Sequence, residues 1–170
     1  VFLSDHFQAW ELAIIDPADI AAGNIDPNYY YEHEVPDSLS EEGKRTVYLY
    51  KVARIDPSVV ELIEEVRRAY GFPIAPDEAY RSYVHNHNTG AAKRSTHLSG
   101  AMDINMERTL AFLRAKCETV PNTTCALSTS AEVRDHIAKL AERAMKRGPG
   151  GGGIGKGTTI LHLDNHPKKQ

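Results

Sequence analysis

One stretch of this chain carries side chains that could bind a metal ion and use it for chemistry. Between residues 95 and 104 the sequence reads Ser-Thr-His-Leu-Ser-Gly-Ala-Met-Asp-Ile, which contains His97 and Asp103, and a second imidazole follows at His162. Two neutral imidazoles and a carboxylate suit a catalytic Zn²⁺, because three protein ligands leave the fourth tetrahedral position open for water. Asp103 and His162 are 59 residues apart (162 minus 103). The pattern therefore indicates a site assembled by the fold rather than a local chelating loop.

The residues around these candidate ligands predict how they are held. Small residues at positions 99 to 101 allow the backbone to turn tightly beside a metal ion. Ile104 follows the candidate carboxylate, and Ile160 and Leu161 precede the second imidazole, which predicts two short buried strands. A lone histidine among the eight of this chain is more often a surface or core residue than a ligand. The metal hypothesis therefore depends on the combination of residue types.

Length and composition predict one globular domain over residues 1–170, with residues 1–45 as an irregular segment packed on it or extending from it. The chain is 41% hydrophobic and 25% charged, which is the ordinary globular range. With a net charge of −3, the chain has no excess of positive charge with which to bind nucleic acid. No apolar run reaches the roughly 18 residues of a transmembrane helix, no signal peptide is evident, and nothing indicates an oligomeric state. Because the chain begins at Val1 rather than Met, it is compatible with a processed or trimmed form.

Other elements follow from apolar periodicity, capping residues and turn residues. In chain order, we predict a helix over 5 to 15, an irregular surface segment over 16 to 45, a strand over 46 to 52, a helix that starts at Asp56-Pro57 and ends at Gly71, a short strand over 72 to 80, a polar loop over 85 to 93, a helix from about Arg108 to Cys117, a helix over 131 to 147, and a strand over 158 to 163. His85 and His87 fall in the polar loop, where they either line a cleft or are simply solvated.

Cys117 and Cys125 are the only cysteines, and a turn-rich segment with Pro and Asn separates them. This close spacing favours a disulfide, which would indicate an oxidising compartment. The alternative is a pair of unpaired thiols in a reducing one.

A glycine-rich run over residues 148 to 155 precedes Lys156 and resembles the first part of a phosphate-binding loop. However, Gly157 stands where such a loop needs Ser or Thr, and a helix precedes the run where a strand is required. We therefore reject a nucleotide site and predict a flexible helix-to-strand connection that could border the active-site cleft.

With these motifs in place, the chain resembles the zinc D,D-peptidase-like family of murein peptidases, peptidase family M15. The likeness runs from about residue 59 to 166 and includes Tyr80-Arg81-Ser82, the Ser95-x-His97 motif, and Gly152 to Gly155 followed by His162-x-Asp164. The resemblance implies an α+β fold of the hedgehog/DD-peptidase type, with a small antiparallel sheet and flanking helices.

The resemblance also implies site roles. His97, Asp103 and His162 would be the ligands of Zn²⁺, and Arg81 and Ser95 would bind substrate. Arg81 would hold a substrate carboxylate or carbonyl with its planar fork, although a surface salt bridge is the alternative. The implied activity is hydrolysis of peptide bonds in peptidoglycan stem peptides or cross-links, by a D,D-carboxypeptidase or endopeptidase in the periplasm or outside the cell.

Two departures from the family pattern leave alternatives open. In the family pattern the Asp ligand stands seven positions after the His ligand, whereas here Asp103 stands six positions after His97. Some branches carry an acid three residues before the last ligand, where this chain has Thr159. Asp164 shares a strand face with His162, and it would act either as the general base or as a carboxylate that orients an imidazole. The alternative function is a non-catalytic, zinc-stabilised binding module of the same fold.

Overall fold

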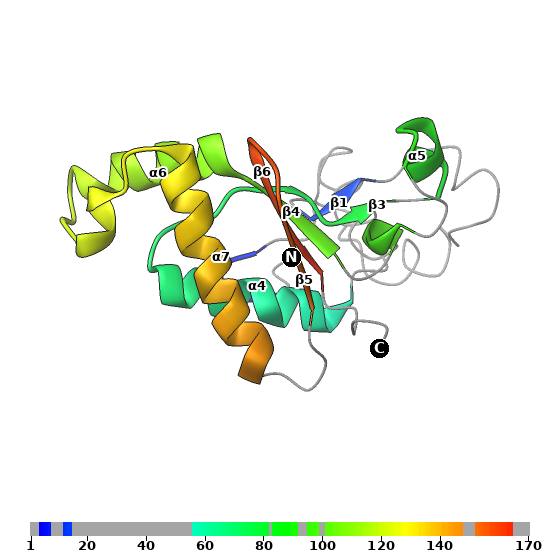
Figure 1. The fold of residues 1–170 in the computed structure, drawn as a ribbon, viewed down its shortest axis with the longest axis horizontal. Helices are drawn as coiled ribbons and strands as arrows, with labels where there is room; N and C mark the ends of the chain where they lie inside the picture. Colours follow the sequence, from blue (N-terminus) through cyan, green and yellow to red (C-terminus); the bar gives the residue numbers. More distant parts are fainter. Residues whose placement is uncertain are drawn as a thin grey trace, which may run out of the picture.

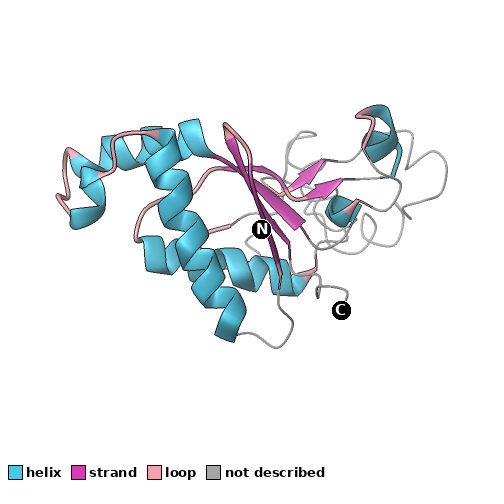
Figure 2. Ribbon diagram, in the orientation of Figure 1, coloured by secondary structure: helices cyan, strands magenta, loops and turns pink. Residues whose placement is uncertain are grey.

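The structure is a computed structural model of the chain, and it describes residues 4–7, 12–14, 56–81, 83–91, 95–98, 101–147 and 152–164. Within these ranges the chain belongs to the α+β class, with a small antiparallel sheet and flanking helices, as predicted (Figure 1). Three helices of 12 to 18 residues lie beside one face of the sheet. The strands β1 (Ala13–Ile14) and β3 (Tyr80–Arg81) and the short helix α5 (Tyr83–Asn88) lie on the side away from them (Figure 1; Figure 2).

Four antiparallel strands form this sheet, and their register positions the candidate ligands. In spatial order they are β2 (Pro76–Glu78), β4 (Ala101–Asn105), β6 (Ile160–Asp164) and β5 (Gly153–Lys156). The central strands β4 and β6 pair along their whole length, so that Asp103 lies opposite His162. The two buried strands predicted around the ligands are therefore confirmed. Strand β6 begins two residues later than predicted, because residues 158 and 159 form a bend after β5.

The two faces of the sheet differ because successive side chains of a strand point in opposite directions. Four side chains that are at most 1% exposed belong to the core-facing side: Met102, Ile104, Leu161 and Leu163. The opposite face presents Asp103, His162 and Asp164, which are only partly buried. The apolar face therefore packs in the core, while the polar face remains partly exposed.

Helix α4 (Pro57–Tyr70) has the boundaries that its capping residues predict. The Asp56 side chain accepts a hydrogen bond from the Ser58 N–H at 2.9 Å, and Pro57 occupies the first turn, where its missing N–H costs nothing. Gly71 ends the helix with φ of 80°, a left-handed conformation that glycine adopts without steric cost. The predicted apolar stripe packs in the core.

Helices α6 (Met106–Cys117) and α7 (Ser130–Arg147) complete the layer beside the sheet. Both were predicted, but α6 begins two residues earlier, because the Asn105 side chain caps it by accepting from the Arg108 N–H at 3.0 Å. The predicted disulfide between Cys117 and Cys125 is present, and it ties the end of α6 to the short 3₁₀ helix η3 (Thr123–Ala126).

The prediction of a helix over residues 5 to 15 is wrong for the part of this segment that the structure describes. Residues 4 to 6 form a bend, and Ala13–Ile14 forms strand β1, which pairs in parallel with β3 (Tyr80–Arg81). The Tyr80 N–H donates to the Leu12 carbonyl at 2.7 Å. Pairing with a segment far along the chain therefore outweighs local helix propensity.

Two segments predicted as irregular contain regular structure. The polar loop includes helix α5 (Tyr83–Asn88), which ends in a turn where Gly90 has φ of 69°. The absence of an apolar stripe concealed this short helix from sequence analysis. The end of the glycine-rich run forms β5, because hydrogen bonding to β6 compensates for the low strand propensity of glycine.

The irregular segment predicted over 16 to 45 and the strand over 46 to 52 lie outside the described residues. Among the residues that are described, no helix combines the length and the apolar character needed to cross a membrane.

Candidate metal site

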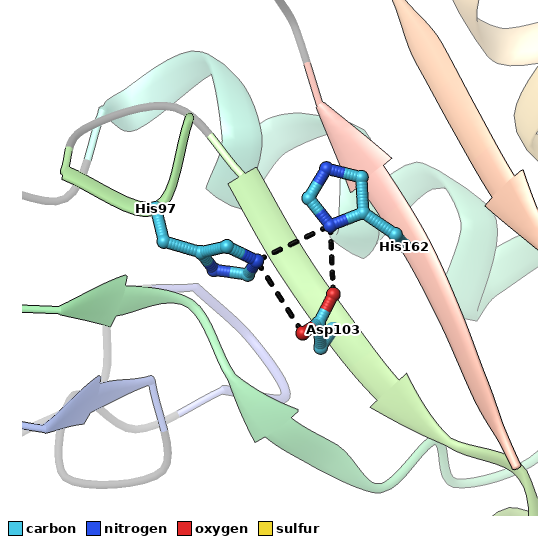
Figure 3. Close-up of side chains that lie close together, drawn as sticks. All are labelled: His97, Asp103 and His162. Carbon is cyan, nitrogen blue, oxygen red and sulfur yellow. Dashed lines mark hydrogen bonds and ion pairs between the residues drawn. The ribbon is translucent and has the colours of Figure 1, made fainter. Parts of the chain in front are cut away.

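Three side chains from separate parts of the chain converge on the polar face of the sheet (Figure 3). The Nε2 atom of His97 lies 3.2 Å from Nδ1 of His162. The two carboxylate oxygens of Asp103 lie 2.7 Å from Nδ1 of His162 and 3.3 Å from Nε2 of His97. Each residue therefore offers one donor atom, and these three atoms all lie within 4.8 Å of one another. This set could hold a metal ion.

His97 is oriented for this role by the backbone. It lies in a short 3₁₀ helix, η2 (Thr96–Leu98), and its side chain is buried. Its Nδ1 atom lies 2.9 Å from the carbonyl oxygen of Ala79, a contact that requires Nδ1–H to donate. Because Nδ1 keeps its hydrogen, a metal ion that replaces the hydrogen on Nε2 would meet the lone pair of that nitrogen, which is directed at the other two side chains. A metal-ligating histidine is commonly held in this way.

Asp103 and His162 are held by the register of β4 and β6. Burial alone would raise the pKa of Asp103, but hydrogen bonds from His162 and His97 outweigh it and hold the pKa well below its usual range. The hydrogen bond to Asp103 raises the pKa of His162, although burial opposes it. A carboxylate that is ionised among imidazoles has the donor chemistry that a divalent cation needs, since the cation takes the place of the shared protons.

The second ring nitrogen of His162 faces Asp164. The Oδ2 atom of Asp164 lies 3.5 Å from Nε2 of His162, and the Thr96 hydroxyl lies 3.4 Å from the same nitrogen. The Gly153 N–H donates to Oδ1 of Asp164 at 3.1 Å, across the strand pair β5–β6. A Cβ atom on Gly153 would overlap this carboxylate. A side chain at position 153 would therefore displace the Asp164 carboxylate from its present position.

Arg81 lies beside the candidate ligands, as the sequence motif suggested. Its Nη2 atom is 3.7 Å from Oδ2 of Asp103, and its Nε–H donates to Glu78. Arg81 therefore makes an ion pair that is partly buried, unlike the surface salt bridge of the alternative, and its role toward substrate stays a prediction. Ser95 lies before the first ligand, where its hydroxyl accepts from the His97 N–H at 3.3 Å. It stabilises the turn that carries His97.

Sequence analysis missed Glu78 and treated His85 as ambiguous. Glu78 is opposite Asp103 on β2, and Nε2 of His85 lies 3.9 Å from its Oε1 atom. The His85 side chain is partly buried, whereas His87 is exposed. The one local signal for Glu78 was its place three residues before Arg81, and that spacing is too common to identify a site.

Comparison with known proteins adds one finding. The model of the family Peptidase M15 matches residues 38–138, which is more than half of the chain. The match begins earlier than the predicted likeness and includes Arg81, His97 and Asp103, but it ends before His162. No curated protein and no solved structure matches the chain. The association of His162 with the matched part therefore depends on the sheet register.

Proposed function

The chain belongs to the peptidase M15 family, and on this premise we propose that it is a zinc metallopeptidase acting on peptidoglycan. Its substrates would be stem peptides or cross-links, cleaved as by a D,D-carboxypeptidase or an endopeptidase. The observation that carries the proposal is the convergence of His97, Asp103 and His162 within 4.8 Å on the polar face of the sheet. The six-residue spacing from the first ligand to the second is compatible with this convergence.

The donor set fits zinc better than a hard cation. Two imidazole nitrogens and one carboxylate are typical of catalytic zinc sites, whereas Ca²⁺ and Mg²⁺ prefer ligand sets made of oxygen. The hydrogen bond from His97 to the Ala79 carbonyl supports this assignment, because it frees the lone pair of Nε2. When bound, Zn²⁺ would act as a Lewis acid that acidifies water and polarises the scissile carbonyl.

The protein side chains around this set would bind and orient the substrate. Arg81 would hold a substrate carboxylate or carbonyl, since its outer N–H groups lie on the Asp103 side of its ion pair with Glu78. Ser95 would support substrate binding through the turn that it stabilises.

Asp164 has two candidate roles in this proposal. Its contact with Nε2 of His162 favours the orienting role, because that nitrogen is the one not directed at the other two ligands. As a general base, Asp164 would instead accept a proton from water at the site. The two roles predict different dependence of kcat on zinc concentration.

An oxidising location is part of the proposal. Disulfides persist in the periplasm and outside the cell and are rare in reducing compartments. The Cys117–Cys125 disulfide therefore supports a periplasmic or secreted protein, where peptidoglycan is also accessible.

A non-catalytic, zinc-stabilised binding module remains the second candidate. It is favoured by Thr159, which stands where some branches of the family carry an acid and is exposed in the bend before β6. Such a module would bind zinc and lose stability without it, but would release no product from muropeptides.

Metal content measured by elemental analysis is the first test, on the purified protein and on Asp103→Ala. Asp77→Ala is the matched control, because Asp77 is an exposed acid on the same sheet. We expect about one zinc per chain in the wild type and the control and much less in Asp103→Ala. Absence of zinc from the wild type after reconstitution would contradict the ligand assignment.

Digestion of purified muropeptides, followed by mass spectrometry, then separates the candidate functions. Release of free D-alanine would identify a carboxypeptidase, and conversion of cross-linked dimers to monomers would identify an endopeptidase. Binding of zinc without either product would favour the binding module.

A further inference from the structure

Glu78 belongs to the same row of side chains as two of the candidate ligands. Its Cα atom is the partner of that of Asp103 across β2 and β4, and Asp103 is the partner of His162 across β4 and β6. The register shifts between Pro76 and Glu78, so strand alternation does not set the face of Glu78 here. Its contact with Arg81, which also lies beside Asp103, places the Glu78 carboxylate on the polar face. Glu78 therefore extends the polar face by one strand beyond the metal site.

The guanidinium group of Arg81 lies between the carboxylates of this row. Its Nε–H donates to Oε1 of Glu78, and its Nη2 atom lies 3.7 Å from Oδ2 of Asp103. The side chains of Glu78 and Arg81 are only 14% and 17% exposed. An ion pair with this degree of burial is screened less by solvent than one on an open surface.

In the metal-loaded protein, the charge of Glu78 would be needed to keep Arg81 in its position. Asp103 would share its charge with the bound cation, so that Arg81 would face a net positive neighbour and be repelled by it. Glu78 is then the anion that keeps the guanidinium in place. By engaging the Nε edge, it also leaves the Nη groups on the side of the metal site.

We propose that Glu78 is a positioning residue that holds Arg81 beside the metal site, so that Arg81 can receive the terminal carboxylate of a peptide substrate. This inference rests on the proposed function. It differs from a direct catalytic role, because Glu78 acts only through Arg81. Holding a flexible side chain in its binding conformation reduces the entropy that binding must offset.

The contact itself can be tested without activity and without metal. In ¹⁵N-edited NMR spectra, the Nε–H resonance of Arg81, assigned by its loss in Arg81→Lys, should be protected from exchange with solvent. We expect Glu78→Gln to shift this resonance and speed its exchange, while Asp77→Asn, an exposed change on the same strand, should leave it unaltered. An unchanged resonance in Glu78→Gln would overturn the proposal.

The function of the contact is tested with N-acetyl-D-alanyl-D-alanine and with the same peptide carrying a C-terminal amide. For the free acid, Glu78→Gln should raise KM by about tenfold and leave kcat within about threefold, the scale of a weakened charge-assisted hydrogen bond. The amide should be affected much less. Glu78→Ala should show the same pattern in larger measure.

A double-mutant cycle distinguishes positioning from a separate role. In an Arg81→Ala background, Glu78→Gln should have no further effect on KM, since the residue through which it acts is gone. Equal losses for acid and amide, or additive losses in the double variant, would overturn the proposal, as would a fall confined to kcat. If the wild type cleaves neither peptide and binds neither by calorimetry, the proposed function fails, and the NMR comparison still decides whether Glu78 holds Arg81.

Discussion

Asp103 and His162 are direct partners on adjacent antiparallel strands, with Oδ1 of the carboxylate 2.7 Å from Nδ1 of the imidazole. A sheet register fixes this pair more firmly than a loop could, because a shift by one residue would turn His162 into the core. His97 joins the pair from a short 3₁₀ helix, held there by a backbone carbonyl. The candidate metal site is therefore built on the paired central strands of the described sheet.

Removal of either imidazole should abolish zinc binding and hydrolysis together. We expect His97→Ala and His162→Ala to lower zinc affinity by more than about 100-fold, since loss of a ligand exceeds the effect of losing an outer partner. Zinc at about 100 times its Kd should stabilise the wild type by roughly 2.7 kcal/mol, and neither variant should show this gain. Calorimetry measures the zinc affinity, and thermal melts measure the stabilisation by zinc. His87→Ala, which alters an exposed histidine, is the control, and retained activity in either ligand variant would refute the assignment.

Asp164→Asn should show whether this carboxylate orients His162 or acts as a base. An orienting role predicts a loss of about 10–100-fold in zinc affinity, with activity largely recovered at saturating zinc. A base role predicts unchanged affinity and a kcat that stays low at saturating zinc. Measuring the zinc affinity of the variant, and its kcat as a function of zinc concentration, distinguishes the orienting role from the base role. We expect the first result, because the carboxylate contacts the outer nitrogen of the ring.

Gly153→Ala should disturb the site through Asp164. The added Cβ would overlap the Asp164 carboxylate, so this group, which faces Nε2 of His162, would have to shift. We expect this variant to lose zinc affinity to an extent similar to Asp164→Asn. In an Asp164→Ala background the obstacle is absent, so Gly153→Ala should then have little further effect on affinity or stability. Equal costs in both backgrounds would contradict this account.

Reduction of the Cys117–Cys125 disulfide should destabilise the fold without emptying the site. Closure of a loop of this length is worth about 2.5 kcal/mol in the unfolded state. Cys117 is the last residue of α6, at the end of that helix away from the sheet (Figure 1). Urea denaturation of a variant with both cysteines changed to alanine should show the loss, and zinc content should be unaltered. A parallel loss of zinc would indicate coupling between the two regions.

Acid should weaken the attachment of residues 4 to 7 to α4 through Glu64. Burial alone would raise the pKa of Glu64, but hydrogen bonds from His6 and Ser4 lower it below its ordinary value of 4.5. A depressed pKa contributes stability that is full above about pH 4.5 and is lost as the pH falls through the lower folded value. Stability measured from pH 3 to 7 should fall less steeply in Glu64→Gln. The exposed neighbour change Glu61→Gln should keep the wild-type slope.

Local signals predicted the elements whose ends are chemically marked. Asp56, Pro57 and Gly71 delimit α4 because caps and turns act within a few residues. The same locality explains the errors. Residues 13 and 14 form a strand only because β3 is beside them, and Gly153 belongs to a strand only because β6 offers hydrogen bonds.

The sequence by itself determined the donor types and favoured the disulfide pair, since these depend on residue identity and short-range spacing, and its likeness to a peptidase family implied the α+β class. Only the tertiary structure decided that His162 meets Asp103 and that Glu78 holds Arg81 beside them. The physical reason is that strand register joins residues far apart in the chain, and no local preference encodes which strands pair. The residue types therefore indicated the metal-binding chemistry, and the pairing of the strands set the positions of the donor atoms.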